Sequence, residues 1–168
     1  TLREKVLNDS VPGCITKLNS GKLEFTSFDN RIKALDDVPS PYLAGILDEF
    51  FDGKLAPMIQ TNRGCPFSCT FCVDGSDDVN QVNQFTTKRV DDELNYISTK
   101  VQKTTHSLLI SDLNFGMYPK DIEVCASIQK IQNKFGYPNY VKVTSGKNRP
   151  DKISQVIKKL GETTSMSL

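Results

Sequence analysis

The chain has 168 residues, of which 38% are hydrophobic and 24% charged. This length suits one domain of ordinary size, and the composition excludes a disordered or low-complexity protein. The 21 basic and 20 acidic residues give a net charge of +1 and are spread along the chain, which argues against a nucleic-acid-binding surface.

The sequence also argues against export and membrane insertion. No apolar run approaches the roughly 20 residues that span a bilayer, and the first residues lack the apolar core of a signal peptide. The five cysteines are therefore expected to be thiols or metal ligands and not disulfides, because reducing compartments do not maintain disulfides. We predict a cytoplasmic protein.

The first 55 residues are expected to form a hairpin and a helix that lead into the core. Residues 14–18 and 22–25 are β-prone and flank the turn formers at 19–21, which predicts a β-hairpin. Ser40 and Pro41 suit an N-cap and a first helical turn. Four apolar residues then recur on one helical face, namely Leu43, Ile46, Leu47 and Phe50. We predict a helix of about three turns that closes at Gly53.

Residues 56–168 alternate between strand and helix patterns. The strand runs are 57–61, 107–111 and 140–144. Each precedes a set of apolar residues at helical spacing: Val90, Leu94, Ile97 and Val101, then Val124, Ile128, Ile131 and Phe135, then Ile153, Val156, Ile157 and Leu160. This alternation predicts an α/β fold with parallel strands and right-handed crossovers.

The periodicity alone leaves open whether the strands form a barrel or an open sheet, and we favour a partial parallel (βα) barrel, truncated after about three units. The chain starts on Thr1 and ends on a β-tolerant run, so Leu168 is expected in a fourth, interrupted strand. In either architecture, functional groups gather at the carboxyl ends of the strands.

Cys65, Cys69 and Cys72 directly follow the first strand of this series, at C-x3-C-x2-C spacing. Thiolates are the protein ligands of iron–sulfur clusters, and a cluster used only for electron transfer normally takes four. A cluster with three protein thiolates leaves one iron free to bind a substrate or cofactor. Catalytic zinc sites differ from structural zinc sites in the same way, because they keep one coordination position open. The spacing therefore predicts a reactive cluster.

Two other interpretations of the cysteines remain. A zinc-stabilised Cys3His interaction domain would need His106 as fourth ligand, but His106 begins the second strand, at the end opposite the cysteine loop. A ferredoxin-like electron carrier would need Cys14 or Cys125 as a fourth thiolate. Cys125 falls among the apolar residues of a helix, where core packing is the simpler role.

The three cysteines, with aromatic Phe71 before the last, resemble the signature of the radical S-adenosylmethionine (SAM) superfamily. The resemblance implies a 4Fe–4S cluster on Cys65, Cys69 and Cys72 with SAM bound at the open iron. Reduction of the cluster would cleave SAM to a 5′-deoxyadenosyl radical that starts chemistry on an unknown substrate. It also implies a reducing electron donor such as flavodoxin or ferredoxin. Phe71 is expected beside the cofactor.

Further segments resemble the subgroup that carries an N-terminal cobalamin-binding domain. They are Val11–Cys14, Leu35–Tyr42 and Asp112-Leu113-Asn114-Phe115, the last in place of the superfamily's Gly-Gly-Glu segment. The resemblance implies that residues 1–55 are an inter-domain region and 56–168 the N-terminal half of a barrel of the radical SAM type. No Asp-x-His-x-x-Gly motif occurs, so cobalamin would bind through a domain outside this chain.

The resemblance also nominates residues for cofactor binding at the ends of the second and third strands. Asp112 and Asn114 are SAM-side candidates. Ser145, Lys147 and Asn148 are candidates for the cofactor or substrate face. No catalytic side chain is assigned, and the substrate and the outcome of the reaction are not indicated.

Overall fold

The computed structural model describes residues 13–27, 32, 34–76, 80–146 and 148–167, which fall into two compact units, 1–33 and 34–168. In the first unit, β1 (Ile15–Lys17) pairs antiparallel with β2 (Leu23–Phe25), which confirms the predicted hairpin. The predicted functional division after residue 55 stays a prediction.

The predicted three-turn helix after Ser40 is wrong, because the chain leaves the helical path after one turn. Ser40 does act as an N-cap, since its Oγ accepts the N–H of Leu43 at 3.2 Å. Gly45, however, adopts a φ of +71°, and the N–H of Ile46 reaches back to the carbonyl of Pro41 at 3.0 Å. This is the Schellman type of helix end. The chain then continues into the 3-10 helix η2 (Asp48–Phe50).

The second unit is an α/β fold around a parallel four-stranded sheet, as the sequence predicts. The strands are β3 (Met58–Ile59), β6 (Ser107–Phe115), β7 (Tyr140–Ser145) and β8 (Thr164–Ser167), in the order β3-β6-β7-β8. The helices are α2 (Thr87–Lys100), α3 (Pro119–Phe135) and α4 (Pro150–Leu160). β8 is the predicted fourth strand, although Leu168 itself lies outside the described residues.

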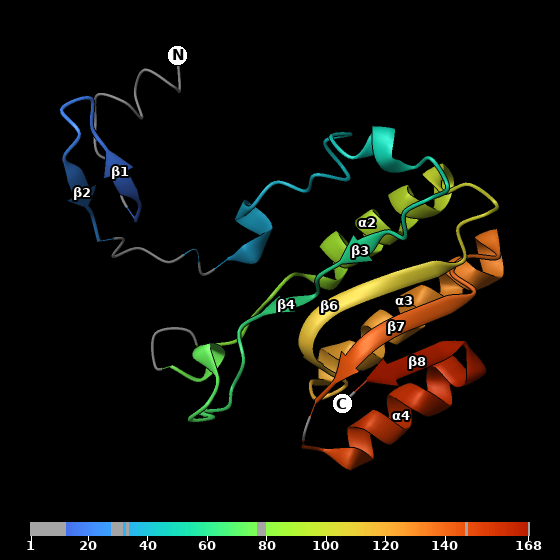
Figure 1. Cartoon of the computed structure of the whole chain (residues 1–168). Coiled ribbons are helices and arrows are strands. Elements are labelled where there is room, and N and C mark those ends of the chain that lie inside the picture. Colours follow the sequence, from blue (N-terminus) through green and yellow to red (C-terminus); the bar gives the residue numbers. More distant parts are fainter. Residues whose placement is uncertain (1–12, 28–31, 33, 77–79, 147, 168) are drawn as a thin grey trace. The chain divides into compact units, whose positions relative to one another are not determined.

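The helices pack in sequence order, α2 on α3 and α3 on α4, and α2 and α3 lie behind the sheet in Figure 1. Most of the predicted apolar residues are buried between helices and sheet, including Val90, Leu94, Ile97, Val124, Ile128, Val156 and Leu160. Ile157 is 48% exposed and Phe135 36% exposed, so these two are corrections. Phe135 is the last residue of α3, and Ile157 lies beside the narrow buried stripe of α4, which consists of Val156 and Leu160.

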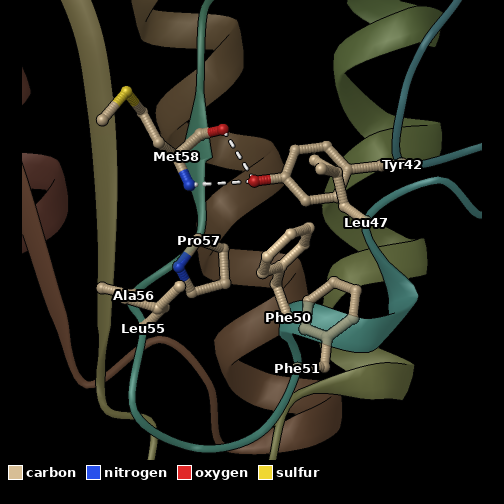
Figure 2. A pocket seen from close by; sticks show the side chains of 8 residues that line it. All are labelled: Tyr42, Leu47, Phe50, Phe51, Leu55, Ala56, Pro57 and Met58. Carbon is tan, nitrogen blue, oxygen red and sulfur yellow. Dashed lines mark hydrogen bonds between the residues drawn. The ribbon is translucent and has the colours of Figure 1, made fainter.

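The edge strand β3 is covered at its start by the segment that replaces the predicted helix. The Tyr42 hydroxyl donates to the carbonyl of Met58 at 2.8 Å and accepts the N–H of Met58 at 3.0 Å (Figure 2). Phe50 and Phe51 line an apolar pocket beside this contact. The contact satisfies backbone groups that an edge strand would otherwise expose.

The remaining elements are short. β4 (Asn62–Arg63) pairs antiparallel with β5 (Asn83–Gln84), and the 3-10 helices η1 (Leu35–Asp37), η3 (Val73–Gly75) and η4 (Gly161–Thr163) complete the described chain. Among the helices in the described ranges, none combines the length and the apolar character that crossing a bilayer requires.

Candidate metal and cofactor site

The cysteine loop connects β4 to β5, and its start is fixed by a buried carboxylate on β6. Asp112 is 1% exposed. Its Oδ1 accepts the N–H of Thr61 at 2.7 Å, and its Oδ2 accepts the side-chain amide of Asn62 at 2.8 Å and the Thr61 hydroxyl. Burial raises the pKa of Asp112, and the hydrogen bonds from Thr61 oppose that rise. The carboxylate thus joins the chain that follows β3 to the middle of β6.

Gly64 extends this fixed region to the first cysteine. Its φ is +103°, and a Cβ at this position would lie 2.0 Å from the carbonyl oxygen of Gln81. Only glycine permits so close an approach of the two backbones. We call residues 61–65, together with Asp112 and Asn114, the loop root. These contacts hold the backbone that leads into Cys65.

Asn114 completes the root through a direct contact with Cys65. Its side-chain amide donates to the Cys65 sulfur at 3.3 Å, and Asn114 itself is only 3% exposed. Along β6, Asp112 and Asn114 continue the buried series of Leu108 and Ile110. Leu113 between Asp112 and Asn114 is exposed, so both candidate side chains are buried within an irregular part of the strand, where the pairing with β7 shifts register.

The rest of the loop has a different character. Residues 68–76, which we call the loop tip, extend beyond β4, away from the sheet, in Figure 1. The N–H of Cys72 donates to the carbonyl of Cys69 at 3.1 Å, and the N–H of Gly75 donates to the carbonyl of Cys72 at 3.1 Å. Cys72 is exposed and Cys69 half-buried. Short-range backbone turns therefore contribute to the shape of the tip.

The three cysteines share one loop without forming one coordination sphere. In the described part of the chain, no three Cys, His, Asp or Glu side chains lie close enough together to hold a metal ion. All three thiols are nevertheless free and at least partly accessible. Thiolates are the ligands that iron–sulfur clusters take, so the donor set fits such a cluster.

A second buried carboxylate lies where β6 turns into α3. Asp121 accepts the N–H groups of Gly116 at 2.7 Å and Tyr118 at 2.9 Å through one oxygen. Its other oxygen and the Tyr118 hydroxyl are buried without a hydrogen-bond partner among the described residues. Burial raises the pKa of Asp121 to about 6. The pKa of Tyr118 is also raised, by burial first and then by the charges of Asp121 and Cys65.

The other predicted cofactor residues differ in exposure. Phe71 is 85% exposed at the loop tip, and Ser145 is 4% exposed at the end of β7, in register with Phe115 of β6. Asn148 is exposed, and Lys147 lies outside the described residues. The structure brings Asp112 and Asn114 to the cysteine loop. The roles proposed for these residues in SAM binding stay predictions.

The alternative ligands lie away from the loop. The His106 ring contacts Asn139 at 2.9 Å, at the amino end of β6, whereas Cys65 contacts the carboxyl end of the same nine-residue strand. That separation is roughly 20 Å. Cys125 is 0% exposed in α3, and burial raises its pKa to about 12. Neither side chain can join the three cysteines in this fold.

Sequence reasoning missed the partners that build the loop root, Thr61, Asn62 and Gly64. One signal was present: two short polar residues directly follow a strand, and an acidic residue ends the neighbouring parallel strand. A buried carboxylate needs hydrogen-bond donors nearby, and the parallel arrangement brings these strand ends together.

Two proteins are related to this chain in sequence. The cobalamin-dependent radical SAM methyltransferase TokK of Streptomyces tokunonensis is 33% identical over 138 residues. The 2-(S-pantetheinyl)-carbapenam-3-carboxylate methyltransferase of Streptantibioticus cattleyicolor is 29% identical over 134 residues. Each alignment covers 76% of this chain but only 19% of the relative. No family model matches the sequence.

Solved structures of the cobalamin-dependent S-adenosylmethionine radical enzyme OxsB share the fold. The form with aqua-cobalamin gives a TM-score of 0.61, and the form with aqua-cobalamin and S-adenosylmethionine gives 0.62. Both are 19% identical to this chain and cover 94% of it, against 23% of the OxsB chain. At this identity the likeness concerns the fold.

Proposed function

We propose a function from the premise that this chain is related to the cobalamin-dependent radical SAM enzymes over 76% of its length. In our proposal Cys65, Cys69 and Cys72 bind a 4Fe–4S cluster, and the protein that contains them uses it to cleave SAM reductively. The observation that carries the proposal is a loop of three free thiols whose first cysteine is held against the carboxyl end of β6.

In this proposal the residues of the chain have different roles. Cys65 is the ligand held by the fold, and Cys69 and Cys72 complete the set from the loop tip. When bound, the cluster would supply one electron to SAM at its open iron. Asp112 fixes the backbone that precedes Cys65, and exposed Phe71 is available to cover the cofactor. Ser145, at the neighbouring strand end, is a candidate for the cofactor or substrate face.

We further propose that the sheet is the first part of a parallel (βα) barrel. The strand order β3-β6-β7-β8 adds each new strand beside the previous one, with no reversal of direction along the sheet. Doubly wound open sheets contain such a reversal, and their ligands bind at that point. In a barrel the site instead lies at the carboxyl ends of successive strands, as the cysteine loop does here.

The activity of the whole protein extends beyond this chain, which spans about a fifth of its relatives. Both relatives are methyltransferases by name, one of them cobalamin-dependent. We propose that cobalamin binds outside the 168 residues and that a flavodoxin or ferredoxin supplies electrons. We also propose a cytoplasmic location, because the cluster and its electron donor need a reducing compartment. The substrate is not specified by the residues described.

Metal content provides the first test. After anaerobic reconstitution, the intact protein containing this chain should hold about four irons and four sulfides. One tightly bound zinc ion without iron uptake would refute the cluster. Dithionite reduction with SAM should then yield 5′-deoxyadenosine, or S-adenosylhomocysteine if the protein methylates through cobalamin. Detection of neither product, with the cluster intact, would refute the SAM chemistry while leaving the metal site.

A further inference from the structure

We infer that Asn114 sets the reduction potential of the cluster by donating a hydrogen bond to the Cys65 sulfur. The inference rests on the proposed function and deepens it. It assigns a role to a residue that the resemblance placed on the SAM side. Its basis is the contact of 3.3 Å between the Asn114 amide nitrogen and the Cys65 sulfur.

The contact is built into the part of the loop that the fold holds in place. Asn114 directly precedes Phe115, which pairs with Ser145 of β7, and Cys65 follows backbone that Asp112 and Gly64 fix. The two side chains therefore meet without help from the loop tip. Assembly of a metal site can rearrange Cys69 and Cys72 while the Asn114 contact is kept.

Burial strengthens the effect of this hydrogen bond. Asn114 is 3% exposed, so little water competes for its amide, and a hydrogen bond is electrostatically stronger in such surroundings. A thiolate sulfur is a better acceptor than the neutral thiol because it carries charge. The contact should therefore strengthen when Cys65 becomes a cluster ligand.

The direction of the effect follows from charge. Reduction adds one electron to the cluster, and part of the added negative charge falls on the ligand sulfurs. An N–H donor stabilises that charge, so it favours the reduced state and raises the potential. Hydrogen bonds to the sulfurs are among the factors that set cluster potentials. Removal of the Asn114 amide should lower the potential and make the cluster harder to reduce.

The test is a redox titration of the reconstituted intact protein without SAM, followed by the EPR signal of the reduced cluster. Asn114→Leu keeps similar bulk but removes the donor. We expect full iron content and a roughly tenfold lower ratio of reduced to oxidised cluster at a fixed potential, which corresponds to about 59 mV for one electron. Asn139→Leu is the matched control, because Asn139 contacts His106 at the opposite end of β6.

Each result decides the inference. An unchanged midpoint in Asn114→Leu, with full iron, overturns it. If that variant loses its iron, wild-type protein labelled with nitrogen-15 asparagine decides instead. Coupling between that nitrogen and the reduced cluster in pulsed EPR supports the contact, and absence of coupling overturns it. Wild-type protein that takes up no cluster refutes the proposed function itself, a separate and distinguishable outcome.

Discussion

The root and the tip of the cysteine loop are held in opposite ways. At the root, buried side chains from two strands hold the chain, with Asp112 bonded to Thr61 and Asn62, and Asn114 bonded to Cys65. At the tip, the backbone turns within residues 69–76 supply the order, and the side chains are largely exposed. A site of this kind places one ligand through the fold and leaves the others to be ordered by the metal they bind.

The largest expected effect is the loss of the cluster when any one of the three cysteines, in the root or in the tip, is replaced. Cys65→Ala, Cys69→Ala and Cys72→Ala should each reduce the iron content of the reconstituted protein from about four to nearly zero, because a cluster with two protein thiolates is poorly held. Iron and sulfide analysis measures this directly.

Cys14→Ala and Cys125→Ala are the matched controls for this loss. Cys125 is buried in α3 and packs in the core, so its replacement should leave the iron content unchanged. Loss of the cluster in either control would revive the electron carrier with four thiolates and contradict the three-ligand site.

Gly64→Ala should produce the next largest effect, a loss of stability that comes from the loop root. The new methyl group would lie 2.0 Å from the Gln81 carbonyl oxygen, at a φ of +103° that suits glycine. Backbone strain and overpacking together should lower the free energy of unfolding by about 5 kcal/mol. Urea denaturation of the apoprotein measures the loss.

Gly136→Ala separates the clash from the strain. Gly136 has a φ of +69°, yet a Cβ there would meet no atom within 4 Å. Its replacement should cost only about 1 kcal/mol, the cost of the backbone conformation. Equal losses in the two variants would show that the approach of Gly64 to Gln81 does not hold the root.

The sequence predicted the sheet and its helices well because hydrophobic periodicity reports burial. Val90, Leu94 and Ile97 are buried on α2 as their spacing predicts, and β8 follows where the run at the end of the chain indicates a strand. The helix after Ser40 failed because one left-handed glycine, Gly45, outweighs an apolar pattern on both of its sides. A local backbone preference of this kind leaves no trace in periodicity.

The candidate site was also predicted only in part. The cysteine spacing is local in sequence, so Cys65, Cys69 and Cys72 could be named directly. The root depends on contacts between residues about 50 positions apart, as between Asn114 and Cys65. Such contacts follow from strand register, which the sequence does not specify: β6 extends to Phe115, four residues beyond the predicted strand. The face on which Asp112 lies was therefore not predictable.

Asp112→Ala should weaken the root without removing a ligand. The change leaves the donors of Thr61 and Asn62 buried without an acceptor, and each unsatisfied group costs about 1–3 kcal/mol. We expect the free energy of unfolding to fall by about 4 kcal/mol, while saturating iron still yields a full cluster. Asp151→Ala, an exposed matched control in the first turn of α4, should cost less than about 1 kcal/mol and leave the iron content unchanged.

SAM affinity in the Asp112→Ala protein addresses its second predicted role. Equilibrium dialysis of the cluster-loaded variant should show weaker SAM binding if the carboxylate contributes to the cofactor site. Wild-type affinity would restrict Asp112 to holding the loop root, in accord with its burial.

Among the residues of the candidate site, the smallest expected effect is a pH dependence that comes from the turn after β6. The pKa of Asp121 rises from its ordinary value of 3.8 to about 6 in the folded protein, because burial disfavours the charged carboxylate. Between these two pH values the folded protein holds a proton that the unfolded chain releases. Stability from this group is therefore present below about pH 4 and is lost as the pH rises through about 6, by about 3 kcal/mol in total.

Asp121→Asn should remove this loss, since the amide oxygen can still accept the N–H groups of Gly116 and Tyr118 while carrying no charge. Urea denaturation of both proteins from pH 4 to pH 8 measures the difference. The variant should gain stability relative to wild type as the pH rises, mostly between pH 4 and 6.5. Asp112 titrates in both proteins, so the difference between the two curves reports the charge of Asp121 together with its interaction with Asp112. Parallel curves would mean that Asp121 is solvated in solution and that the turn beside the loop root opens more readily than its burial indicates.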